Sequence, residues 1–131
     1  MDEENFISQL IGEFPEIKDD ILDEDNLGLI SLQIISFKVF TQKAIDAEDL
    51  KLVKRCFLFV DRVFDAVSPS TNNSLVISYL VKLVFKENCQ AINLLSFKLS
   101  KVIVEYNQAF YVGSENNKLN RFIRNFDLDQ S

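Results

Sequence analysis

Two carboxylates near residue 25 are spaced like the first ligands of a calcium-binding EF-hand loop. Asp23 and Asp25 stand at its first and third positions, and Gly28 stands at its sixth. Leu27 occupies the fifth position, where an oxygen ligand is needed, and Ile34 occupies the twelfth, where a bidentate glutamate belongs. The sequence therefore predicts no calcium site here, and these carboxylates belong to a larger charge pattern.

Residues suited to catalysis or metal binding are few. The chain has no histidine, so a general base near neutral pH would have to be a perturbed carboxylate, lysine or cysteine. Cys56 and Cys89 are far apart, and Cys56 falls on an apolar helix face, where burial raises the pKa of a thiol. Three glycines could hardly build a phosphate-binding loop. We predict that the protein is not an enzyme and has no catalytic residue, cofactor or metal.

The negative charge is concentrated in the first fifth of the sequence. Residues 1–26 hold ten acidic residues and one lysine, a charge of −9, which leaves +3 for the rest of a chain whose net charge is −6. One interpretation is a solvated surface that keeps an apolar domain soluble. The other is a docking surface for a basic protein, since opposite charge speeds encounter whereas the acids would repel nucleic-acid phosphates.

The elements that must position these residues are predicted to be helices. The chain is 47% hydrophobic with only 3 glycines and 2 prolines, too few turn residues for a many-stranded sheet. In residues 50–67, apolar positions cover roughly 200° of a helix, and Leu58 is the one apolar residue on the remaining charged arc. Residues 27–45 carry a core face and a second stripe behind it, Leu32, Ile35 and Val39, which a neighbouring helix or a partner could cover.

The helices are predicted to pair as hairpins in a single domain, residues 1–131. Residues 27–67 form the first hairpin, with Asp46 expected to cap its second helix. Residues 71–112 form the second, one helix ending near Lys86 and the next beginning near Cys89.

A tail helix is expected within residues 114–131, where apolar residues again recur at helical spacing. The predicted fold is all-α, an antiparallel bundle of four to six helices, with two stacked HEAT-like hairpins as the alternative. An acidic amino terminus and the lack of an apolar run of about 18 residues predict a cytoplasmic protein.

The acidic stretch FPEIKDDILDEDN, followed by the helical stretches ISLQIISFKVFTQKAI and LKLVKRCFLFVDRVF, resembles small acidic all-helical bacterial proteins. These include toxin-immunity proteins and uncharacterised helical domain families. The resemblance covers pattern over most of the chain and no specific motif, so it assigns no residue roles. It implies a small, cytoplasmic, non-catalytic protein that blocks a cognate toxin by occlusion.

Charge and patterning together predict a protein-binding module, most concretely an immunity or inhibitor protein that meets a basic toxin or nuclease-like effector. No direct binding to nucleic acid or membrane is expected, and a homodimer is left open. The main alternative is a HEAT-like adaptor or regulatory scaffold; an enzyme and a phage mimic of nucleic-acid charge rank below it. The predicted partner-binding residues are Asp19, Asp20, Asp23, Glu24, Asp25, Leu58, Leu32, Ile35 and Val39.

Overall fold

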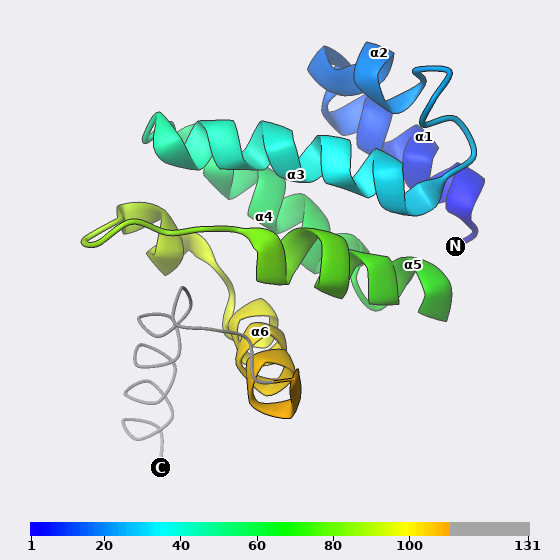
Figure 1. Ribbon diagram of the computed structural model, residues 1–131. Helices are drawn as coiled ribbons and strands as arrows, with labels where there is room; N and C mark the ends of the chain where they lie inside the picture. Colours follow the sequence, from blue (N-terminus) through cyan, green and yellow to red (C-terminus); the bar gives the residue numbers. More distant parts are fainter. Residues whose placement is uncertain (111–131) are drawn as a thin grey trace.

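A computed structural model describes residues 1–110, and all regular structure in that range is helical (Figure 1). The all-α fold class predicted from apolar spacing is confirmed, and the arrangement is consistent with a helical bundle. No helix within residues 1–110 is long and apolar enough to cross a membrane. The tail helix predicted at 114–131 lies outside the described residues.

The acidic amino-terminal segment folds into two helices that supply part of the core. Helix α1 spans Glu3–Glu13, and the Asp2 side chain caps it by accepting a hydrogen bond from the Asn5 amide. A 3₁₀ turn, Pro15–Ile17, leads into the short helix α2, Lys18–Ile21. The side chains at spacings of three and four are buried: Phe6, Leu10, Phe14, Ile17 and Ile21. The acids of this segment lie mainly on its opposite, exposed side.

Helices α3, Ile30–Asp46, and α4, Leu50–Val63, form an antiparallel hairpin beneath α1 and α2 (Figure 1). Phe14 joins the two layers, because its ring lies 5.3 Å from Phe37, 5.7 Å from Phe40 and 5.8 Å from Phe59, measured between ring centroids. Such aromatic contacts hold the amino-terminal segment against both helices of the hairpin.

The cap of α4 differs from the prediction. Asp46 is the last residue of α3, and Asp49 caps α4 by accepting a hydrogen bond from the Leu52 amide at 3.3 Å. The predicted cap was wrong because α3 continues almost to the turn, which Glu48 makes in a left-handed conformation with φ of 56°.

The helix predicted to reach about Lys86 ends earlier, at Lys82, and is irregular. It consists of α5, Pro69–Ser74, a π-helical turn, Leu75–Tyr79, and a 3₁₀ turn, Leu80–Lys82. The chain is then extended, because the backbone of Val84 exchanges two hydrogen bonds of 2.9 Å with the Gln42 side chain on α3. A contact between residues far apart in sequence therefore ends this helix.

The single helix predicted from about Cys89 to residue 112 is wrong in its first part. Gln90–Leu94 form a 3₁₀ helix, and α6 begins only at Phe97 and runs to Phe110. Ser96 marks the break, because its hydroxyl accepts a hydrogen bond from the Leu99 amide and donates one to Asp61 on α4. Apolar periodicity continues across the break since both pieces face the same core.

Candidate partner-binding surface

Acids of the α2 region and apolar residues of α3 border one surface hollow of about 350 Å³. It is lined by Asp20, Asp23, Asn26, Ile35, Ser36 and Val39. In Figure 1, α2 and α5 lie on opposite sides of α3, and the lining residues place the hollow on the α2 side. Two acids and two aliphatic residues that separate sequence patterns had singled out are thus brought together.

Hydrogen bonds hold the acidic loop on α3. The Gln33 side chain, which is buried, donates to the Ile21 carbonyl at 3.1 Å. The Asn26 side chain donates to the Asp20 carbonyl at 2.9 Å and to the Ser36 hydroxyl at 3.4 Å. These contacts fix the position of the acids relative to α3 before any partner binds. Asn26 was missed in the sequence, where it looks like an ordinary loop residue, whereas Ser36 was noted only as a small residue beside Leu32, Ile35 and Val39 that a helix or a partner could cover.

Within residues 1–110, the acids of the surface form no ion pair. All five predicted acids are exposed. The ion pairs within residues 1–110 join Lys98 to Asp61 and to Asp65, at 3.6 and 3.0 Å, and involve none of the five. The Asp23 side chain accepts a hydrogen bond from the Asp25 amide, so its carboxylate has a defined position. Asp20 and Asp23 in the hollow therefore form no ion pair with a described lysine or arginine.

Leu32, Ile35 and Val39 form an exposed row on α3, which we call the α3 stripe, and Leu29, the residue before the helix, is also exposed. Leu32, Ile35 and Val39 expose 40%, 41% and 42% of their surface, and Leu29 exposes 53%. Leu32, Ile35 and Val39 recur every three or four residues, so they share one side of the helix, opposite the side that carries the buried Phe37. Within the described chain the α3 stripe is thus a helix face without a covering element.

Leu58 lies apart from these residues. It projects from α4 with 58% of its surface exposed and does not line the hollow. Its helical neighbours one turn away on either side, Lys54 and Arg62, are exposed and basic. Asp19, Glu24 and Asp25 also lie outside the lining of the hollow, so they contribute charge near it without forming its wall.

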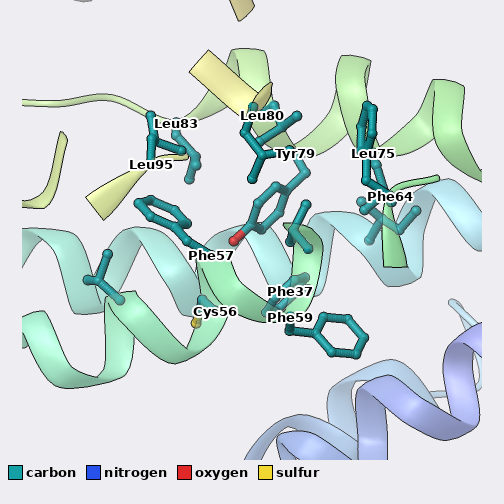
Figure 2. Packing of buried hydrophobic residues seen from close by; sticks show 14 of the residues in the cluster. Phe37, Cys56, Phe57, Phe59, Phe64, Leu75, Tyr79, Leu80, Leu83 and Leu95 are labelled. Atoms are coloured by element: carbon teal, nitrogen blue, oxygen red, sulfur yellow. The ribbon is translucent and has the colours of Figure 1, made fainter. Parts of the chain in front are cut away.

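The buried thiol of Cys56 lies in the core and not at this surface. Burial raises the pKa of Cys56 from the ordinary 9.0 to about 11, although a hydrogen bond with Thr41 acts in the opposite direction. Figure 2 shows Cys56 beneath Tyr79, among the large apolar side chains. Within residues 1–110, no three His, Cys, Asp or Glu side chains gather as metal ligands.

Fold and surface together define a small all-helical protein that carries an acidic, partly apolar face. A family model described as a domain of unknown function, DUF7674, matches residues 7–111, so the chain belongs to this family. Comparison with curated proteins found no match, and comparison with solved structures found none either. The matched range includes α2 and α3, and therefore the whole hollow.

Proposed function

We propose that this protein is a non-catalytic, cytoplasmic inhibitor that binds a basic protein, most concretely a cognate bacterial toxin, and neutralises it by occlusion. The observation that carries this proposal is the hollow between α2 and α3, where Asp20 and Asp23 border the exposed side chains of Ile35 and Val39. Carboxylates without an internal partner beside uncovered aliphatic groups are suited to a protein surface that is both basic and apolar.

The aliphatic and the acidic residues of the surface have different roles in binding. Burying the remaining exposed area of one aliphatic side chain contributes up to about 1 kcal/mol. Burial of Leu32, Ile35 and Val39 alone therefore gives weak association. The charge of −9 on residues 1–26 adds attraction over several ångströms and speeds encounter with a positively charged partner. Opposite charge therefore guides association, and the aliphatic contacts slow dissociation.

The partner can be sought directly by capturing it with the tagged protein from its native cells, together with the product of the neighbouring gene. Mass spectrometry at low and high salt then identifies what is bound. A single basic, toxic protein that is released at high salt supports the inhibitor. Several housekeeping proteins, retained at high salt, would contradict it and favour the helical adaptor.

A matched pair of variants tests which carboxylates are used. Asp20→Asn with Asp23→Asn removes two charges in the hollow, and each amide keeps an oxygen that can accept a hydrogen bond. Glu3→Gln with Glu4→Gln removes two charges from the first turn of α1, outside the hollow. We expect the first variant to slow association with the captured partner about threefold at low salt. The second should slow it less, and high salt should abolish the difference. Equal slowing by both pairs would remove the hollow from the proposal.

A further inference from the structure

We infer that the partner presents an amphipathic helix, which lies along α3 with its aliphatic residues on the α3 stripe and lysines or arginines beside Asp20 and Asp23. The inference rests on the proposed function, because it uses the same surface. It specifies the structural element and the side-chain pattern by which the partner is recognised.

The spacing of the α3 stripe favours a helix. Leu32 and Val39 are seven residues apart, which corresponds to about 10 Å along the helix axis, or about two turns. Side chains repeating every three or four residues form the ridges that fit the grooves of a second helix. An extended strand would repeat every second residue and would need an open sheet edge, and residues 1–110 contain no strand.

The elements on either side of α3 limit where the helix can lie. On one side, Asp20 and Asp23 rise beside Ile35 and Val39. On the other, α5 is held against α3 by a 3.0 Å hydrogen bond between the Ser31 and Ser74 hydroxyls. Figure 1 shows α3 between α2 and α5. We therefore place the partner helix along α3, between these two elements.

The position of the carboxylates predicts where the basic residues of the partner helix lie. Carboxylates border the stripe on its α2 side, so the lysines or arginines should lie on that flank of the bound helix. Lys43 is exposed one turn beyond Val39 and marks the end of the acid-lined part. The bound helix is thus basic on one flank, aliphatic on its lower face and unrestricted elsewhere.

The surface is already arranged for such a contact. Gln33 on α3 holds the backbone of the α2 region through the Ile21 carbonyl, and Asn26 links the Asp20 carbonyl to the Ser36 hydroxyl on α3. Binding need not reorganise the backbone, and its cost falls mainly on the side chains of the α3 stripe.

A designed peptide provides the probe. It is a helix of about four turns with leucines every three or four residues and lysines on one flank, long enough to cover the α3 stripe. One control has the same composition with the leucines in alternation, as in a strand, and another replaces the lysines with glutamates. Binding to the full-length chain is measured by fluorescence anisotropy and mapped by amide chemical shifts.

We expect the helical peptide to bind with shifts confined to α2 and α3, and both controls to bind at least about tenfold more weakly. Ile35→Ala with Val39→Ala should weaken binding about fivefold or more, as expected when contact residues at an interface are truncated. Leu58→Ala, the matched truncation on α4, should change it less than twofold. Both variants replace exposed residues, and thermal melting verifies that they remain folded.

Other outcomes would overturn the inference. Equal binding of the alternating peptide would mean charge attraction without helix recognition, and shifts around Leu58 would place the contact on the wrong helix. Association measurements with the captured partner distinguish this failure from failure of the proposed function. If its association still depends on Asp20 and Asp23, the inhibitor proposal stands and only the helical element is wrong.

Discussion

The hydroxyls of Thr41 and Tyr79 form a directional contact inside the apolar core. The Thr41 hydroxyl donates to the Phe37 carbonyl at 3.0 Å, so the Tyr79 hydroxyl, 2.9 Å away, is the donor to Thr41. The Tyr79 ring also stacks on Phe37, with centroids 4.7 Å apart and planes 16° from parallel. These contacts fix the position of the π-helical turn that carries Tyr79 relative to α3.

The direction of these hydrogen bonds predicts unequal effects of removing each hydroxyl. Thr41→Val leaves the Tyr79 hydroxyl fully buried without an acceptor, which should lower the free energy of unfolding by about 1–3 kcal/mol. Tyr79→Phe leaves Thr41 bonded to Phe37 and should cost about 1 kcal/mol. The double variant should cost less than the sum. Urea unfolding measures all three, and a larger loss for Tyr79→Phe would contradict the assigned direction.

Cys56 predicts a loss of stability in alkaline solution. Its pKa rises from 9.0 to about 11 through burial, so above pH 9 the unfolded chain releases this proton more readily than the folded chain. Stability should therefore be unaffected by this group below pH 9 and fall by up to about 3 kcal/mol as the pH approaches 11. Burial raises the pKa of Tyr79 too, which adds a loss of the same sign.

The contribution of the thiol can be separated by comparison with Cys56→Ala. The Cys56→Ala variant should be less stable than the unchanged protein at neutral pH because of the cavity. Its free energy of unfolding should fall less steeply between pH 9 and 11. Urea unfolding under reducing conditions at several pH values provides the slopes. Parallel slopes for the two proteins would show that Cys56 ionises normally in the folded chain.

At the scale of elements, two exposed glycines have opposite roles. Gly12 lies within α1, and Gly28, in the turn before α3, has a φ of +78° that L-residues rarely adopt. A methyl group at either position would meet no atom within 4 Å. Gly12→Ala should therefore raise the free energy of unfolding by about 0.5–1 kcal/mol, and Gly28→Ala should lower it by about 1–2 kcal/mol. Thermal melting checks both, and a destabilised Gly12→Ala protein would contradict the helical propensity argument.

The helices that were predicted well differ from those that were not in how local their determinants are. The α3–α4 hairpin falls within the predicted range 27–67 because its apolar periodicity is strong and its turn is short. The Pro69–Lys82 run and the break at Ser96 depend on Gln42 bonding Val84 and on Asp61 bonding Ser96. Neither contact has a signal in the local sequence.

At the scale of the whole molecule, residues 1–26 are a structural element and not a removable acidic tail. Five of their apolar side chains are buried with at most 4% of their surface exposed: Phe6, Leu10, Phe14, Ile17 and Ile21. Phe14 also lies under the Arg55 guanidinium, 5.2 Å from the ring centroid, and Arg55 donates to the Glu13 carbonyl. The same segment thus supplies most of the negative charge and part of the core.

Deleting residues 1–26 should therefore abolish cooperative unfolding, because it exposes the apolar faces of α3 and α4. Phe14→Ala alone should lower the free energy of unfolding by about 3–5 kcal/mol, a large part of the stability of a domain of this size. Glu3→Gln with Glu4→Gln in the full chain is the matched control and should retain a cooperative transition. A cooperative melt of the truncated chain would show that α1 and α2 are dispensable for folding.

By itself the sequence determined the helical class, the concentration of acids in residues 1–26 and the doubly apolar character of residues 27–45, because each depends on composition or on neighbours within about four residues. Only the tertiary structure decided that Asp20 and Asp23 share a hollow with Ile35 and Val39, and that Leu58 lies elsewhere. Packing of α2 across α3 sets these relations, and it arises from contacts such as Gln33 with Ile21 that join residues distant in the chain.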